Sequence, residues 1–213
     1  MASSFSSQID VIVNLMIRLA PRQVLDIGKG FGKYGFLLHE YYGIDNTKKP
    51  DPTRTLAEQS RVVIDAVESN PDYLWPHLAQ FYRKVIRGRI EELYSGLSGY
   101  DLVLMLDVIE HIGKAEGAAI IRHFVSGGAA MIVSTPSEYF DQQLYESSDE
   151  HHVSFWGVSD ISVLGFPFDH QTVGAGRVFL ITPGPMDIRG FGNHPVKKLR
   201  RIARTLRSEL FGR

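Results

Sequence analysis

The sequence predicts an α/β protein with a doubly wound, mainly parallel sheet of seven strands and an antiparallel edge strand. Two observations carry this prediction. Short apolar runs that are typical of buried strands alternate along the chain with stretches of helical periodicity. Near the end, a glycine-rich turn over 174–176 joins two β-type runs directly, which indicates an antiparallel pair.

The expected elements follow one another in a regular order. An amphipathic helix is expected over 5–20, where apolar residues recur about every three to four positions. Asn70 and Pro71 form an N-cap and first-turn pair for a later helix. Strands are expected at 24–27, 62–68, 84–87, 101–106, 129–134, 168–172 and 177–182, and further helices at 34–42, 70–81 and 110–125.

Size and composition fit one globular domain with a short appendage. The chain has 213 residues, of which 44% are hydrophobic and 22% are charged, and these values are close to those of ordinary globular proteins. We expect one domain over 1–190 that includes a polar insertion at 43–60, followed by a tail over 191–213.

Charge and cysteine content exclude several classes of function. A net charge of −1 gives no global attraction to nucleic acid. The absence of cysteine excludes disulfides, thiolate-bound metals and a thiol nucleophile, and it favours a cytoplasmic protein. No apolar run approaches the roughly 18 residues that a transmembrane helix needs. We therefore expect no transmembrane segment.

The tail contains a basic amphipathic stretch over 196–210. Leu199, Ile202 and Leu206 mark one helical face, and lysines and arginines fill the other. A solvated helix that docks on the domain is one interpretation. Peripheral contact with a membrane surface, or with nucleic acid, is the other.

A glycine-rich loop directly after the first strand carries the strongest functional signal. It reads V-L-D-I-G-K-G-F-G-K-Y-G over 24–35, and its glycines let the backbone turn tightly and approach a ligand closely. A nicotinamide cofactor would need G-x-G-x-x-G directly after the strand. The frame from Gly28 fails because Lys33 occupies its last position, and the frame from Gly30 begins too far from the strand end.

The segment V-L-D-I-G-x-G-x-G resembles motif I of the class I S-adenosylmethionine-dependent methyltransferases. The resemblance implies that Asp26 helps to hold the amino-acid end of the cofactor. It also implies that Glu68, at the end of the second strand, accepts both ribose hydroxyls; the competitor Asp45 leaves no room for a helix and a strand after the glycine loop. The backbone would pass beneath the cofactor at Gly28, Gly30 and Gly32.

The family commonly carries an acidic residue after the third strand that reads the adenine amino group. Arg89 stands at that place here, so the backbone around Ile90 is left for the contact. Ser69 and Asp107, which follow the second and fourth strands, complete the expected cofactor site.

Catalytic candidates follow the fourth and fifth strands. D-L-V-L-M-L-D-V-I-E-H over 101–111 resembles the corresponding segment of methyltransferases that act on small molecules, and D-E-H-H-V-S-F-W over 149–156 adds a second polar cluster. Ligands of open α/β sheets lie beyond the carboxyl ends of the strands, so we expect Glu110, His111 and His152 to line the acceptor pocket. Otherwise the second cluster is surface loop, and His111 only packs against the cofactor.

A metal site is the alternative use of these residues. The pattern E-x-x-E-H with a later H-x-x-x-W resembles two kinds of metal-dependent O-methyltransferase, which act on the 3′-terminal ribose of small RNAs and in ubiquinone biosynthesis. If the helix begins early, Asp107, Glu110 and His111 lie at i, i+3 and i+4 and share one face of it. The resemblance implies Mg or Mn ligation, with an aspartate in place of the first glutamate, by Asp107, Glu110, His111 and His152.

The leading functional hypothesis is S-adenosylmethionine-dependent O-methylation of a small molecule such as a sugar, a lipid or a natural-product intermediate. Metal-assisted 2′-O-methylation of RNA is the alternative on the same fold, favoured by the basic tail and opposed by the neutral net charge. A nicotinamide oxidoreductase and a catalytically silent binding module are the alternatives of other classes.

Overall fold

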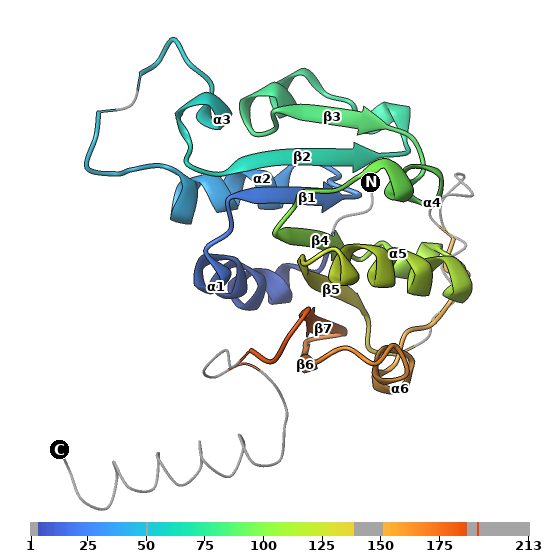
Figure 1. Cartoon of the computed structure of the whole chain (residues 1–213). Helices are drawn as coiled ribbons and strands as arrows, with labels where there is room; N and C mark the ends of the chain where they lie inside the picture. Colours follow the sequence, from blue (N-terminus) through green and yellow to red (C-terminus); the bar gives the residue numbers. More distant parts are fainter. Residues whose placement is uncertain (1–3, 50, 139–150, 187–190, 192–213) are drawn as a thin grey trace, which may run out of the picture.

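The computed structural model describes residues 4–49, 51–138, 151–186 and 191. Its centre is a seven-stranded sheet in the order β3-β2-β1-β4-β5-β7-β6 (Figure 1). β7 pairs antiparallel with both β5 and β6, and the other pairs are parallel. The strands are β1 Gln23–Ile27, β2 Val63–Glu68, β3 Lys84–Arg87, β4 Leu102–Leu106, β5 Ala130–Pro136, β6 Phe168–Val173 and β7 Gly176–Ile181. The predicted fold class and the antiparallel edge are therefore confirmed.

Helices and short helical turns connect the strands. The α-helices are α1 Ile9–Leu19, α2 Lys33–Leu38, α3 Leu56–Gln59, α4 Ile90–Leu93, α5 Lys114–Ser126 and α6 Val158–Ser162. A π-type turn, η2 His39–Gly43, extends α2. The 3-10 turns are η1 Ser6–Gln8, η3 Pro71–Tyr73, η4 Pro76–Gln80, η5 Tyr94–Gly96 and η6 Ile109–His111.

The sheet separates two hydrophobic cores, as a doubly wound fold requires. Successive strand residues point to opposite faces, so β4 supplies Leu102, Leu104 and Leu106 to one core and Val103 and Met105 to the other. The first core is covered by α1 and α2, and the second by α4, α5 and α6. Both faces of the central strands are thereby buried, and these strands read as continuous apolar runs for that reason.

The helix expected over 70–81 is wrong in type. The Asn70 side chain caps as predicted, accepting a hydrogen bond from Asp72 N at 3.0 Å, but the chain then forms the two separate turns η3 and η4. Trp75, the residue before Pro76, is extended at φ −92° and ψ 146°. A proline ring disfavours helical geometry in the residue before it, which breaks the helix here.

The helix expected over 110–125 begins later. Ile112 is extended at φ −114° and ψ 140°, and Gly113 precedes the first residue of α5 at φ −57° and ψ 147°. Asp107 adopts the left-handed region at φ 53°, which is uncommon for a residue with a side chain. Asp107, Glu110 and His111 therefore do not share one face of an α-helix; a strand end and the short turn η6 place them.

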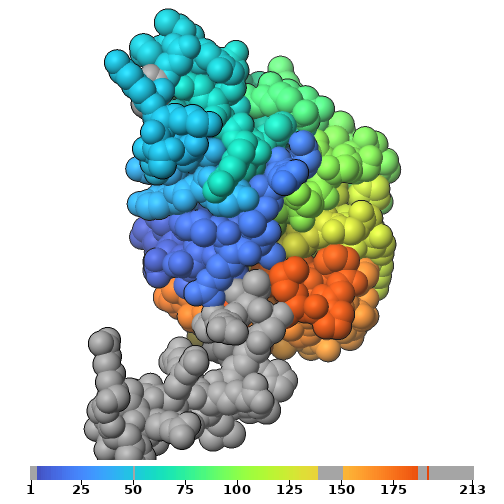
Figure 2. All heavy atoms as spheres, turned by 60° about the vertical axis from the view of Figure 1, so that its left-hand side comes forward, coloured from blue at the N-terminus to red at the C-terminus, as the bar shows by residue number. Residues whose placement is uncertain are grey.

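The polar segment over 43–60 forms a local unit at one end of the molecule, opposite β6 and β7 (Figure 2). It contains α3, in which no residue is buried. A capping box between Thr55 and Glu58 forms the N-terminus of this helix. The basic stretch over 196–210 and the acidic pair Asp149 and Glu150 lie outside the described residues. Within the described ranges, no helix is long and apolar enough to cross a membrane.

Candidate active site

A cavity of about 290 Å³ opens where β1, β2 and β4 end. This is the edge at which an open parallel sheet binds ligands. The glycine loop, the residues after β2, β3 and β4, and the N-terminal Ser4 and Phe5 form its walls. The cavity brings together ten of the predicted site residues, which are Asp26, Gly28, Gly30, Glu68, Ser69, Ile90, Asp107, Glu110, His111 and His152.

The glycine loop needs glycine for two different reasons. A Cβ at Gly28 would lie 2.4 Å from Val108 Cγ2, and the residue has a φ of +68°. Gly32, with a φ of +84°, would place a Cβ 2.9 Å from Leu78 Cδ2. Such contacts and dihedrals exclude side chains. Gly32 is absent from the cavity wall, so it serves the turn into α2 and its packing and does not itself line the cavity.

Glu68 lies at the β2 side of the cavity and is already held by backbone groups. Gly30 N donates to its Oε2 at 3.3 Å, and Asn70 N donates to its Oε1 at 3.0 Å. Lys29 Nζ lies 3.7 Å from Oε2 and donates to Tyr73 O at 2.7 Å. Both side chains are buried. Sequence reasoning missed Lys29, whose only local signal is its place inside the glycine loop.

Asp26 is buried beside Tyr82, whose hydroxyl donates to Asp26 Oδ2 at 2.6 Å. Burial raises the pKa of Asp26 to about 6, although the Tyr82 hydrogen bond and the Lys29 charge act to lower it. A Cβ at Gly35 would lie 2.6 Å from Tyr82 Cζ, so the tyrosine ring packs directly on α2. Tyr82 was not predicted as a site residue, because it is distant from Asp26 in the sequence.

On the β4 side, Asp107 is bound by the N-terminal segment. Phe5 N donates to Asp107 Oδ2 at 3.1 Å, and Ser134 Oγ donates to Oδ1 at 2.8 Å. Lys33 Nζ holds the same segment by donating to Ser4 O at 2.9 Å. Burial raises the pKa of Asp107, and the bonds from Ser134 and Phe5 oppose this rise.

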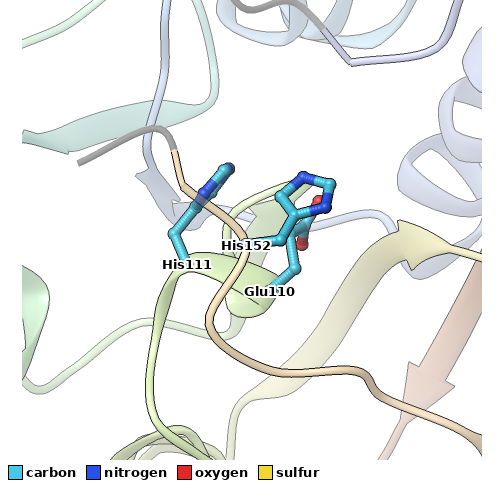
Figure 3. Close-up of side chains that lie close together, drawn as sticks. All are labelled: Glu110, His111 and His152. Carbon is cyan, nitrogen blue, oxygen red and sulfur yellow. The ribbon is translucent and has the colours of Figure 1, made fainter. Parts of the chain in front are cut away.

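Glu110, His111 and His152 converge at the same side, from η6 and from the segment before α6 (Figure 3). Their candidate ligand atoms lie within 4.8 Å of one another, in a group that does not include Asp107. The two imidazole rings are 5.1 Å apart between centroids. Val153 N and Ser154 N both donate to Glu110 O, which fixes the second segment against η6.

Burial also raises the pKa of Glu110 well above its usual range, and the neighbouring Asp107 carboxylate adds to the rise. Glu110 Oε2 and Thr135 Oγ1 are buried and have no hydrogen-bond partner beyond each other among the described residues; the Thr135 hydroxyl acts to lower the pKa of Glu110. His111 Nδ1 is hydrogen-bonded to His151 O at 3.0 Å, which orients its ring. A buried acid with a strongly raised pKa and few partners is typical of a site that a ligand or ion completes.

The segment after β3, where we expect the adenine contact, lines the cavity. The Arg89 side chain pairs with Glu91 at 2.8 Å, while Ile90 is buried and lines the cavity. An apolar side chain thus lies at the cavity directly after β3.

Comparison with solved structures identifies the class of fold. The methyltransferase domain of a bacterial Hen1 is 18% identical, with a TM-score of 0.56, over 83% of this chain and 97% of that one. The N-terminal domain of EvdMO1, solved with SAH and D-fucose, is 12% identical with a TM-score of 0.55, over 84% and 83% of the two chains. Magnesium protoporphyrin IX methyltransferase from Synechocystis PCC 6803, solved with SAH, is 15% identical with a TM-score of 0.54, over 82% of each chain.

These similarities show that the chain has the class I methyltransferase fold. No protein-family model matches the sequence, and no curated protein is significantly similar to it.

Proposed function

We propose that this protein is an S-adenosylmethionine-dependent methyltransferase that methylates an oxygen of a small molecule. The observation that carries the proposal is the single cavity at the strand ends, which joins the glycine loop and Glu68 to the group formed by Glu110, His111 and His152. The fold is shared with solved structures that contain SAH or SAM, which supports the same choice of cofactor.

The residues of the β2 side fit the adenosine part of this cofactor. The Glu68 carboxylate offers about four acceptor positions, and its two backbone bonds leave the others for a pair of ribose hydroxyls. The side-chain-free backbone at Gly28 allows close approach. Ile90 supplies an apolar wall at the β3 side. Asp26 is the acidic group nearest the start of the loop.

When bound, S-adenosylmethionine supplies an activated methyl group, so the protein chiefly positions the acceptor and accepts its proton. Imidazole is the side chain whose ordinary titration range spans neutral pH, which suits a general base for a hydroxyl. His152 is half-buried on the cavity wall, and we assign it this role. Two neighbours surround His152. The buried Glu110 lies beside it, and the hydrogen bond to His151 O orients the ring of His111.

Isothermal titration calorimetry with S-adenosylmethionine, SAH and NAD tests the proposal. We expect both sulfur ligands to bind and NAD to give no heat of binding. Binding of NAD alone would indicate the oxidoreductase. Binding of SAM without any methyl transfer to sugar, lipid and RNA acceptor panels would favour the silent binding module.

Metal-assisted 2′-O-methylation of RNA is the second candidate, and one observation favours it. Glu110, His111 and His152 offer a carboxylate oxygen and two imidazole nitrogens within 4.8 Å of one another. Such a set suits Mg or Mn better than a thiolate-preferring metal, and a bound ion would polarise an attacking hydroxyl. Asp107 is not in this set, because the set contains only ligand atoms that all lie within that distance of one another.

The second candidate makes two claims that the first does not. Methyl transfer to short RNA should fall in the presence of a chelator and return with added Mg or Mn. Mn binding, measured by electron paramagnetic resonance without substrate, should weaken in both His111→Ala and His152→Ala. Transfer that is insensitive to the chelator would leave histidine as a base or positioning group.

A further inference from the structure

Arg177 is a half-buried cation at the edge of the sheet where the cavity opens, and the site described above does not use it. It is the second residue of β7, whose first residue, Gly176, pairs with the cavity-lining Pro136. Because β7 is antiparallel to β5, its beginning lies at the same edge as the end of β5. Arg177 therefore lies next to the β4 side of the cavity, two strands beyond β4.

The strand residues beside Arg177 on its face of the sheet are not acidic. Arg177 pairs in register with Thr135 on β5 and Thr172 on β6, and such cross-strand partners lie on the same face. His170 shares this face, whereas Asp169 points to the other, because side chains alternate along a strand. Across the residues that the structure describes, no ion pair involves Arg177.

The guanidinium group of Arg177 also has a buried donor that is not used. Its Nε is buried without a hydrogen-bond partner among the described residues. A buried donor is normally satisfied by the protein, a water or a ligand. The planar guanidinium can donate two parallel hydrogen bonds to the two oxygens of a carboxylate or phosphate. The unused Nε therefore leaves one edge of the group free for such a pair.

His170 provides a second observation that favours an anion. Burial lowers the pKa of His170, and the positive charge of Arg177 lowers it further, while Asp169 acts in the opposite sense. The imidazole ring lies against the rings of Phe168 and Phe179, at 6.3 Å and 5.9 Å between ring centres. An anion beside Arg177 would counter its positive charge and so raise the pKa of His170.

The strands place Arg177 close to the catalytic group. Thr135, its partner on β5, interacts with the Glu110 carboxyl, and neighbouring strands lie about 4.8 Å apart. A small molecule with its hydroxyl at His152 is therefore long enough to extend to the beginning of β7. We propose that Arg177, with His170 beside it, binds a carboxylate or phosphate group of the methyl acceptor. This inference rests on the proposed function, and it restricts the acceptor to small acidic molecules.

Simple oxyanions test the subsite before the acceptor is known. Inorganic phosphate and acetate are titrated into the full chain with and without SAH, with sodium chloride holding the ionic strength constant. Nuclear magnetic resonance follows the Nε–H signal of Arg177 and the ring signals of His170. We expect saturable shifts of both signals with at least one oxyanion, and a higher pKa of His170 in its presence. The two probes distinguish a phosphate subsite from a carboxylate subsite.

Arg177→Gln removes the charge and keeps a polar side chain. The oxyanion concentration that half-saturates the His170 shift should rise about 10- to 100-fold, the usual loss for a hydrogen bond to a charged group. Arg87→Gln, at an exposed position on β3, is the matched control and should leave the titration unchanged. The melting temperature of each variant shows whether it is folded.

Methyl transfer provides the second measurement. Acidic acceptors that the parent methylates in an acceptor panel are compared with their uncharged methyl esters. In Arg177→Gln the KM for the acid should rise about 10- to 100-fold, while kcat stays within about twofold. The KM for the ester should not change.

The outcomes separate this inference from the function on which it rests. If SAH does not bind, or no acceptor is methylated, the proposed function fails. If SAH binds and transfer occurs, but neither oxyanion shifts the two signals or Arg177→Gln leaves the titration unchanged, the oxyanion subsite is wrong. Equal use of acids and esters by the parent would also contradict it. A preference for the acid that Arg177→Gln removes supports the subsite.

Discussion

The two sides of the cavity are built in different ways. On the β2 side, Glu68 is held by Gly30 N, Asn70 N and Lys29, all of which lie in or directly after neighbouring parallel strands. On the β4 side, segments far apart in the sequence meet: Phe5 N binds Asp107, and His152 lies beside His111. Glu110 and Thr135, which are buried there, have side-chain oxygens with no hydrogen-bond partner beyond each other among the described residues.

The difference indicates which side of the cavity gains hydrogen-bond partners when a ligand binds. A carboxylate whose bonds are already made can receive a cofactor without rearrangement, which is the preorganisation that binding favours. Unsatisfied buried groups cost stability in the free protein and are tolerated where function uses them. We therefore expect the β2 side to set cofactor affinity and the β4 side to set turnover.

The largest expected effect is a loss of turnover, without a loss of cofactor affinity, when a residue of the β4 side is changed. His152→Ala should lower turnover by about 100-fold or more, because removal of a general base typically costs that much. Its affinity for SAM should stay within about twofold, since His152 lies across the cavity from Glu68. Steady-state kinetics and calorimetry measure the two quantities. Full turnover in this variant would show that His152 is a surface-loop residue without a role in catalysis.

The second effect is the pH dependence of stability that Asp26 causes. The pKa of Asp26 is about 6 in the folded protein against an ordinary value of 3.8, so the folded state binds the proton more tightly than the unfolded chain does between these pH values. Stability should fall as pH rises through this window and level off above it. The penalty is roughly 3 kcal/mol, at about 1.4 kcal/mol per unit.

Asp26→Asn removes this titration and keeps an acceptor for Tyr82. Urea unfolding at several pH values should show that its advantage over the parent grows between about pH 4 and pH 6. The exposed change Glu40→Gln is the control. Parallel stability curves for Asp26→Asn and the parent would mean that Asp26 is not buried as a carboxyl of raised pKa.

The third effect tests the preformed β2 side. Glu68→Gln replaces one accepting oxygen by an amide that cannot accept, opposite Gly30 N or Asn70 N. The amide also leaves the ribose hydroxyls fewer acceptor positions. An unpaired buried donor costs about 1–3 kcal/mol, so SAM binding should weaken roughly 5- to 150-fold. Calorimetry measures this, with Glu40→Gln as control. Unchanged affinity would show that the ribose is bound elsewhere.

The smallest effect concerns a single hydroxyl on the β4 side. Ser134→Ala removes one of the two bonds to the Asp107 carboxylate and should lower the free energy of unfolding by about 1 kcal/mol. Ser137→Ala, whose hydroxyl bonds Ala175 O in an exposed setting, should change it by less than about 0.5 kcal/mol. Equal losses in thermal or urea unfolding would contradict the special role of the bond to Asp107.

Local patterns predicted the elements well where one local rule applied. The third strand was expected at 84–87 and is found there, and the glycine-linked pair β6 and β7 forms as expected. Helix limits failed where one residue overrides periodicity, as Pro76 does between η3 and η4 and Gly113 before α5. The proline effect is readable from the sequence, because it acts on the preceding residue alone.

The sequence by itself determined the succession of strands along the chain, the glycine loop and the residues that follow each strand. Parallel strands bring these residues to one edge of the sheet, whatever the conformation of the connecting loops. Only the tertiary structure decided the partners. Tyr82 meets Asp26 across 56 positions and Phe5 meets Asp107 across 102. Pairing over such distances depends on how layers pack, and short-range periodicity and spacing carry no information about it.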